Sequence, residues 1–197
     1  MDIDPAALSS RDAYKLMISC IIPRPIAFVT TLSRDGVTNL APFSFFNGVS
    51  SDPPVVSIAV ATKRDGSRKD TWRNIEETGE YVINVVVPEL MDAVIIGARE
   101  LPHNVSELDL AGLQTLPSTK VKPPRLAASP INLECTLLRI VEVEETALIL
   151  GRVVMVHAKD EVLDGGRVDP RRLTFVGRLG DDLYCRVTDL FERKRAP

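Results

Sequence analysis

The feature that most constrains the fold is a pair of long strand-like segments in the second half of the chain. Residues 131–143 and 147–158 are dominated by aliphatic and β-branched side chains, and only residues 144–146 separate them. Segments of this composition joined by so short a connection are typical of antiparallel strands in a hairpin. The sequence therefore predicts a long β-hairpin, with Gly151 and His157 on one face of its second strand.

Shorter segments extend the antiparallel pattern along the rest of the chain. Residues 25–32 and 37–40 have strand composition, and residues 33–36 between them have the sequence of a hairpin turn. Further strands are expected at 55–62 and 80–87, and helices at 10–19, 70–78 and 88–98. At least six strands, mostly joined by tight turns and with helices inserted between some of them, predict a mainly β antiparallel barrel.

Composition narrows the class of protein. With 45% hydrophobic and 26% charged residues among 197, the chain can bury a sizeable core, and no linker divides residues 1–197 into more than one domain. The net charge of -3 and the scattered basic residues make nucleic acid an unexpected partner. No apolar run is long enough to span a membrane, and the N-terminus does not resemble a secretory signal.

The first predicted helix and the three cysteines add further expectations. Ser9 or Ser10 caps the first predicted helix, whose apolar residues recur at three-to-four spacing, and we expect this stripe to face the core. Cys20, Cys135 and Cys185 are far apart and have apolar neighbours, which favours buried, reduced thiols in a cytoplasmic protein.

Residues 39–47 form an unusual segment in which a strand pattern gives way to a loop rich in aromatic and amide groups. Three of the six phenylalanines lie here, at Phe43, Phe45 and Phe46. The segment has two interpretations. It is either an apolar surface for a planar ligand or a strand end whose phenylalanines fill the core.

Residues 62–71 form a second unusual segment, which is cationic, rich in hydroxyl groups and placed just before a predicted helix. We expect Asp70 to be the N-cap of that helix. The hydroxyls of Ser67 and Thr71, the ammonium of Lys69 and the free N–H groups of the first helical turn could converge on one phosphate. The alternative is a solvated basic loop followed by a helix cap.

Other catalytic patterns find no support in the sequence. The two histidines, His103 and His157, have no partner at metal-ligand spacing, so no metal site is expected. The chain also lacks a nucleophile elbow, a paired-carboxylate pattern, a dinucleotide-binding glycine motif and a P-loop.

Several blocks resemble the signatures of the flavin reductase-like family of FMN-binding split β-barrel proteins, which is related to flavoredoxins. The blocks are residues 24–27, 39–46, 69–71 with Asn74 and Ile75, 121–125, 129–135, 151–154 with His157, 177–180 and 189–191. They cover nearly the whole chain in order. Residues 183–186 depart from the family pattern, which more often has paired tyrosines and an alanine there.

The resemblance implies an antiparallel Greek-key split barrel with noncovalently bound FMN. Main-chain groups of residues 41–46 would hold the isoalloxazine ring, residues 67–71 would bind the phosphate, and a homodimer interface would complete the site. His157 is a candidate for the ring or nicotinamide side, or else a sheet histidine whose hydrogen bonds the backbone satisfies. The implied cofactor-binding residues are Arg24, Pro25, Asn39, Ala41, Ser44, Phe45, Lys63, Ser67, Lys69, Asp70 and Thr71.

The resemblance also implies an activity. The leading expectation is an NAD(P)H:flavin reductase that passes a hydride from NADH or NADPH to FMN, serving a flavin-using monooxygenase or an electron-transfer partner. A flavin supplies the hydride chemistry itself, which fits the lack of a catalytic triad. The alternatives are a flavoredoxin-like FMN electron carrier, a non-catalytic FMN-binding protein and, more remotely, a pyridoxamine phosphate oxidase.

Overall fold

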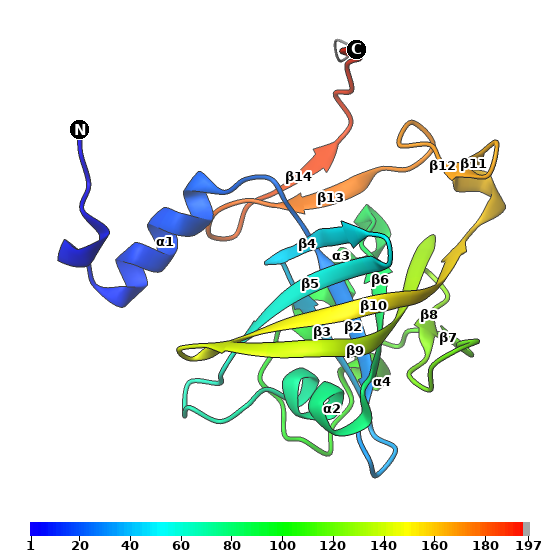
Figure 1. The fold of residues 1–197 in the computed structure, drawn as a ribbon, viewed down its shortest axis with the longest axis horizontal. Coiled ribbons are helices and arrows are strands. Elements are labelled where there is room, and N and C mark those ends of the chain that lie inside the picture. Colours follow the sequence, from blue (N-terminus) through cyan, green and yellow to red (C-terminus); the bar gives the residue numbers. More distant parts are fainter. Residues whose placement is uncertain (195–197) are drawn as a thin grey trace.

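The computed structural model, described here for residues 1–194, is built on a seven-stranded sheet in which every neighbouring pair is antiparallel (Figure 1). The strand order is β3-β2-β6-β9-β10-β5-β4. The strands are β2 (Ala27–Leu32), β3 (Thr38–Phe43), β4 (Phe46–Ser51), β5 (Pro54–Ala61), β6 (Glu80–Val85), β9 (Ile131–Val143) and β10 (Thr146–Ala158). The predicted mainly β, antiparallel architecture with inserted helices is confirmed.

The long hairpin is the longest pairing in this sheet. β9 and β10 pair from Val143 opposite Thr146 to Ile131 opposite Ala158, with two shifts of register that bend the strands. One shift lies at Gly151, where an added Cβ atom would come 1.8 Å from the hydroxyl oxygen of Tyr81. Only glycine therefore allows the buried Tyr81 ring to lie against β10.

The two edges of the sheet are joined by a two-residue corner. β3 and β4 are opposite edge strands, yet only Ser44 and Phe45 separate them in the chain, so the sheet curls until its edges approach at this corner. The Phe45 carbonyl accepts a hydrogen bond from the Ala59 N–H at 2.9 Å. The loop expected within residues 39–47 is therefore shorter than predicted, because strand pairing continues to Phe43 and resumes at Phe46.

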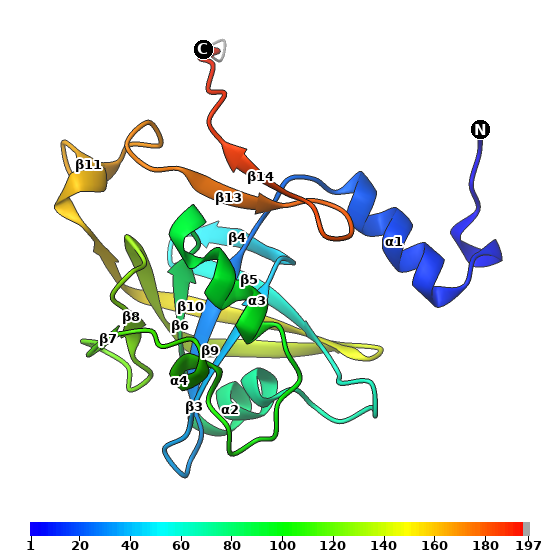
Figure 2. The ribbon, with the colours of Figure 1, turned by 180° about the vertical axis from the view of Figure 1, so that it is seen from behind.

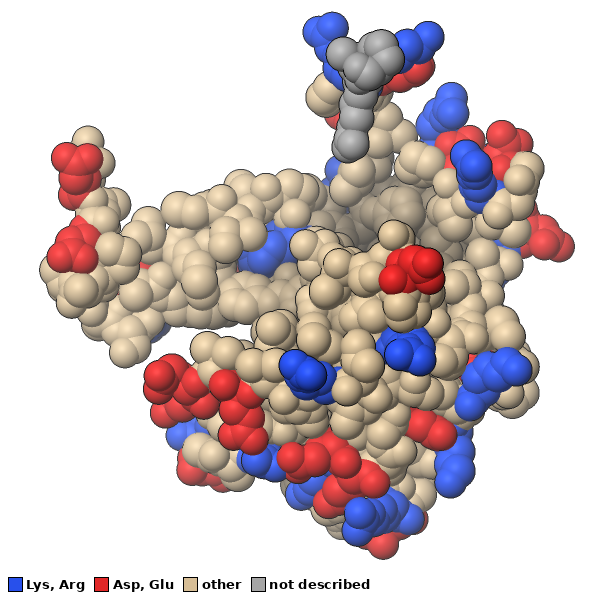
Figure 3. Space-filling model, in the orientation of Figure 1, with Lys and Arg blue, Asp and Glu red and all other residues tan. Residues whose placement is uncertain are grey.

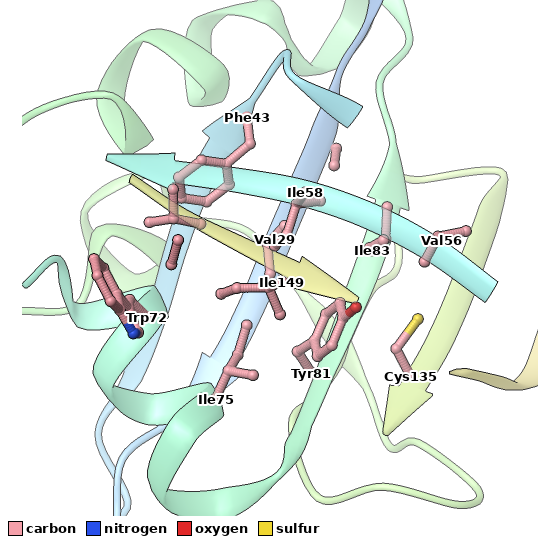
Figure 4. Close-up of a cluster of buried hydrophobic side chains, with 13 residues drawn as sticks. Val29, Phe43, Val56, Ile58, Trp72, Ile75, Tyr81, Ile83, Cys135 and Ile149 are labelled. Carbon is pink, nitrogen blue, oxygen red and sulfur yellow. The ribbon is translucent and has the colours of Figure 1, made fainter. Parts of the chain in front are cut away.

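The concave side of the curled sheet holds the main core. Val29, Ile58 and Ile149 are fully buried there, and Trp72 and Ile75 reach them from helix α2 (Asp70–Thr78) (Figure 4). A second cluster lies on the other side of β2 and β3, beneath α3 (Met91–Gly97) and α4 (Glu107–Leu110) (Figure 2). Helices thus cover β3 where it approaches the start of α2.

A small second sheet and the first helix lie outside this body. The sheet comprises β1 (Arg24–Pro25), β13 (Phe175–Arg178) and β14 (Tyr184–Val187), and α1 (Ser10–Cys20) extends beside it. Ser9 caps α1 as predicted, accepting the Asp12 N–H. The expectation that its stripe faces the core is wrong, because Ile18 is the one buried residue of this helix. The periodicity identified an apolar face but not the surface that covers it.

The burial of the three thiols differs from the expectation that all of them are buried. Cys135 is buried, whereas Cys20 is exposed and Cys185 is half-buried, because only Cys135 lies on a core strand. Within residues 1–194 no helix is long and apolar enough to cross a membrane. The short elements are η1 (Pro5–Ala7), η2 (Pro88–Leu90), η3 (Asp160–Val162), β7 (Thr115–Leu116), β8 (Arg125–Leu126), β11 (Leu163–Asp164) and β12 (Arg167–Val168).

Candidate functional site

A cavity of about 130 Å³ lies where β3 meets the start of α2; we refer to it as the α2 pocket. Its lining combines the middle of β3, the basic segment before α2, the end of α3 and the start of α4. The lining residues are Asn39, Ala41, Pro42, Phe43, Lys63, Lys69, Asp70, Thr71, Gly97, Ala98, Arg99, Glu100, Leu101 and Glu107. Six of the predicted binding residues therefore meet here, from two segments that are far apart in the sequence.

The N-terminus of α2 gives this pocket a positive end. Lys69 is the N-cap, and no side chain caps the helix. The first N–H groups of a helix have no partner within the helix, and with the helix dipole they favour an anion. The prediction that Asp70 is the N-cap is wrong. Asp70 begins the helix itself, and its carboxylate contacts Lys63, Arg73 and His103 instead.

The charges around the pocket are only partly compensated. Lys63 is paired with Asp70, with Nζ 3.0 Å from Oδ2. Among residues 1–194 neither Lys69 nor Arg99 makes an ion pair. Glu107 is buried at the back of the pocket, and burial, reinforced by the nearby Asp70 carboxylate, raises the pKa of its carboxyl group.

Thr71 is the best-positioned hydroxyl of the pocket. The Asn39 side chain donates from Nδ2 to Thr71 Oγ1 at 2.9 Å and to Thr31 Oγ1 at 3.3 Å. Asn74 also donates to Thr31, at 3.0 Å, so buried amides and hydroxyls form one network behind the pocket. Because Thr71 Oγ1 already accepts this bond, its own proton can be donated to an anion in the pocket.

The corner between β3 and β4 lies beyond the other end of the β3 segment that lines the pocket. Arg24 donates from Nε to Ser44 Oγ at 3.3 Å, and its guanidinium lies 5.9 Å from the centre of the Phe45 ring. Phe43 is buried, whereas the rings of Phe45 and Phe46 are half-buried. One interpretation of residues 39–47 predicted phenylalanine rings in the core, and the other predicted an apolar surface. The structure has one phenylalanine in the core and two whose rings are partly exposed.

Arg24 also holds together three parts of the chain. It is buried, and its guanidinium donates to the carbonyl oxygens of Ile18 and Ile21 at 2.6 Å each and of Leu179 at 2.8 Å. These bonds join the end of α1 and the β13–β14 turn to the corner. Burial lowers the pKa of Arg24.

Six of the twelve predicted site residues do not line the α2 pocket: Arg24 and Pro25 belong to β1, Ser44 and Phe45 form the corner, and Ser67 and His157 lie elsewhere. The Ser67 hydroxyl donates to Asp65 at 2.6 Å in an exposed turn. His157 lies in a different hollow, with Nε2 2.6 Å from Glu134 Oε1, so a carboxylate and not the backbone satisfies it. Burial opposes ionisation of Glu134, but the N–H groups of the 119–121 loop and His157 outweigh it and lower the pKa of this carboxyl.

Sequence reasoning missed the third wall of the pocket. Residues 97–101 and Glu107 lie about 30 positions beyond the basic segment, and nothing in their own pattern indicates a binding site. The close approach of Gly97 to β3, where an added Cβ would lie 2.8 Å from the Leu40 carbonyl oxygen, is a tertiary feature. In the sequence, only the presence of a glycine at position 97 could have indicated this close approach.

Comparisons with known proteins identify the family of the chain. The flavin reductase like domain matches residues 18–177. The crystal structure of nitrilotriacetate monooxygenase component B from Bacillus cereus is 36% identical, with a TM-score of 0.93 and 98% of each chain covered. The 2-nitrobenzoate 2-nitroreductase NbaA of Pseudomonas fluorescens is 32% identical, with a TM-score of 0.91, and the match covers 100% of this chain and 96% of that chain. A split barrel domain protein of Shewanella frigidimarina, 22% identical with a TM-score of 0.87 and full coverage of both chains, shows the same fold. The chain therefore belongs to the flavin reductase-like domain family.

Proposed function

We propose that this protein is an FMN-dependent oxidoreductase, and specifically an NAD(P)H:flavin reductase that passes a hydride from NADH or NADPH to FMN. The observation that carries the proposal is the α2 pocket, an uncapped helix start that faces the strand leading to the Ser44–Phe45 corner. From Asn39 to Ser44 an extended chain spans roughly 17 Å, about the length of an extended flavin mononucleotide. The phosphate and the ring of one FMN can therefore bind at opposite ends of this segment.

The chain's own residues would hold the FMN in this way. The first N–H groups of α2, the Thr71 hydroxyl and the Lys69 ammonium would bind the phosphate. Main-chain groups of Ala41, Ser44 and Phe45 would hold the ring, and Asn39 and the Arg24–Pro25 strand would lie beside the ring or ribityl chain. When bound, the flavin supplies the hydride chemistry, so the protein need only bind, orient and tune it.

We further propose that the working form is a homodimer of Greek-key split barrels, each formed by residues 1–197, in the cytoplasm. The surface along α1 and β4 is mostly uncharged, whereas charged side chains gather around α2 and the β9–β10 turn (Figure 3). Tyr14, Met17 and Val49 are exposed on these elements. An apolar helix face that residues 1–194 leave exposed is typical of a subunit interface, and the flavin ring proposed to bind at the nearby corner would lie beside it.

The likeness to nitrilotriacetate monooxygenase component B favours a flavin-using monooxygenase as the partner that consumes the reduced FMN. The likeness to 2-nitrobenzoate 2-nitroreductase favours a second candidate, in which the flavin stays bound and reduces an organic acceptor. The two differ in flavin retention. A reductase that supplies flavin releases it on desalting, whereas an enzyme with a resident flavin stays yellow.

The deciding experiment follows nucleotide oxidation by purified protein with NADH or NADPH, with and without added FMN. We expect oxidation to depend on FMN and to saturate with it. Failure to oxidise either nucleotide, with FMN nevertheless bound, would leave the electron-carrier and FMN-binding alternatives. Failure to bind FMN at all would refute the whole proposal.

A further inference from the structure

A second hollow, of about 340 Å³, lies between the β7–β8 pair and the end of β10; we call it the β10 hollow (Figure 1). Its volume is within the range of small-molecule sites, roughly 300–1,000 Å³. A row of directly opposed residues crosses the sheet from His157 in this hollow to Pro42 in the α2 pocket, through Asn132, Asn84 and Phe28. Four strand spacings, roughly 19 Å of sheet, therefore separate the two sites.

The lining of the β10 hollow is cationic. Arg125, His157 and Lys159 line it, and no acidic residue of the described chain does; the exposed Asp160 and Glu161 follow Lys159 but lie outside the lining. Among residues 1–194 neither Arg125 nor Lys159 makes an ion pair. Arg125 directs Nε and Nη2 to one acceptor, the Pro117 carbonyl oxygen, at 3.1 and 3.0 Å. Its Nη1 N–H groups therefore remain for an anion.

The buried Glu134 carboxylate fixes the orientation of the His157 ring. It accepts the N–H groups of Thr119, Lys120 and Val121 at 2.5–3.2 Å, and His157 Nε2 lies 2.6 Å from its Oε1. Because three N–H groups already point at this carboxylate, it is an acceptor and Nε2 of His157 is the donor. Nδ1 is then the ring nitrogen left for a ligand, and a protonated ring donates from it to an anion.

Two buried polar side chains form the floor of the β10 hollow. Ser129 and Asn132 are only 2% and 3% exposed, and both belong to its lining. Asn132 donates from Nδ2 to Asn84 Oδ1 at 2.8 Å and to the Leu126 carbonyl oxygen at 3.3 Å, whereas no group of residues 1–194 donates to its Oδ1. An amide oxygen accepts a hydrogen bond from a hydroxyl group. A ligand that satisfies both the rim and the floor therefore carries an anionic group and a hydroxyl.

We propose that the β10 hollow is a second ligand site, which binds a small hydroxylated organic anion of the sugar phosphate or hydroxy acid type. Lys159 and Arg125 hold the anionic group, His157 donates to it from Nδ1, and Asn132 Oδ1 accepts a hydroxyl of the ligand. The wall is in place before the ligand binds, because Glu134 and Arg125 anchor the 117–121 loop. The inference does not rest on the proposed flavin activity.

The test uses the two histidines of the chain, since His157 lies in the β10 hollow and His103 lies beside the α2 pocket. NMR of intact, flavin-free protein with labelled histidine reads the two sites separately, and His103→Gln assigns the two resonances. The probes are ribose 5-phosphate, citrate and the uncharged sugar ribose, each up to about 10 mM. We expect a saturable shift of the His157 resonance with ribose 5-phosphate or citrate and none with ribose. The tighter of the two anions identifies the charged group that the site prefers.

Variants separate a built site from general surface charge. Lys159→Ala should weaken the bound anion about fivefold and Lys159→Arg should restore most of the affinity. Arg152→Ala removes the same charge from an exposed position of β10 outside the hollow and should change nothing. Equal weakening in Lys159→Ala and Arg152→Ala would overturn the inference.

The intact protein alone can also refute the inference, so the result does not depend on any variant folding. No shift of the His157 resonance with either anion would overturn it. A shift of His103 alone would place the anion at the α2 pocket and overturn it as well. Flavin binding is measured separately, so failure of the proposed function and failure of this site remain distinguishable.

Discussion

Thr71→Val tests the proposed phosphate site with little change of shape. Valine has nearly the same shape as threonine but has no hydroxyl, so the substitution removes the proton that Thr71 can donate into the α2 pocket. It also removes the acceptor of the Asn39 amide bond of 2.9 Å. Asn39 keeps its second bond, to Thr31 at 3.3 Å, so the buried amide is not left without any partner.

The expected loss of affinity follows from the kind of bond removed. A hydrogen bond to a charged group contributes roughly 1.5–3 kcal/mol, which corresponds to about a 10- to 150-fold weaker Kd for FMN. Riboflavin has no phosphate and should lose no more than about twofold. The stability cost should be near 1 kcal/mol, the usual value of one neutral buried hydrogen bond.

The assay is a titration that follows quenching of flavin fluorescence by wild-type protein, Thr71→Val and Thr71→Ser. The serine variant keeps the hydroxyl but loses the methyl group, and it should retain most of the FMN affinity, so it separates the effect of the hydroxyl from a general effect of substitution at this position. Thermal unfolding of each variant without flavin checks that the fold is intact. Parallel losses for FMN and riboflavin in Thr71→Val would refute the assignment of the phosphate to the start of α2.

Three further substitutions test the remaining parts of the structure. Gly151→Ala places a Cβ 1.8 Å from the hydroxyl oxygen of the buried Tyr81 and should cost about 3 kcal/mol, a fall of roughly 6–12 °C in Tm measured by calorimetry. Glu107→Gln keeps an oxygen for the Leu40 N–H and removes a buried charge beside the anion site, so it should tighten FMN about threefold at neutral pH in the same titration; weaker binding would contradict this. The lowered pKa of Glu134 means that its stabilising contribution is complete above the ordinary pKa of 4.5 and lost as the pH falls through the lowered value, so the Tm difference between wild type and Glu134→Gln should shrink in acid; a constant difference would contradict this.

Most of the fold could be predicted from the sequence, because the strongest patterns in the sequence are local. The β9–β10 hairpin, the Ser9 cap and the helix over residues 70–78 depend on composition and turn chemistry within a few residues, and all three are present. The misplaced cap at Asp70 shows the limit. Asp70 suits an N-cap on local grounds, but three cationic or histidine side chains from separate segments surround its carboxylate one position inside the helix.

The candidate site was predictable only where its residues are clustered in the sequence. Asn39 and Thr71 belong to the two segments singled out by composition, and the structure joins them by a hydrogen bond. The position of the segment between Gly97 and Glu107 could not be predicted, because it depends on the packing of Gly97 against the Leu40 carbonyl and on the hydrogen bond from the Leu40 N–H to Glu107. Such contacts appear only after the sheet has curled and α3 has packed on it.

Arg24 shows how the proposed ring site would depend on parts of the chain outside the large sheet. Its guanidinium already donates to three carbonyl oxygens and to Ser44, so little hydrogen-bonding capacity is left for a ligand. Its effect on a flavin must therefore act mainly through the position of the Ser44–Phe45 corner. The same side chain anchors the end of α1, the helix whose apolar face awaits a partner in the proposed dimer. In the proposed dimer, association through α1 would reach the proposed ring site through one buried side chain, and cofactor binding would then depend on dimer formation.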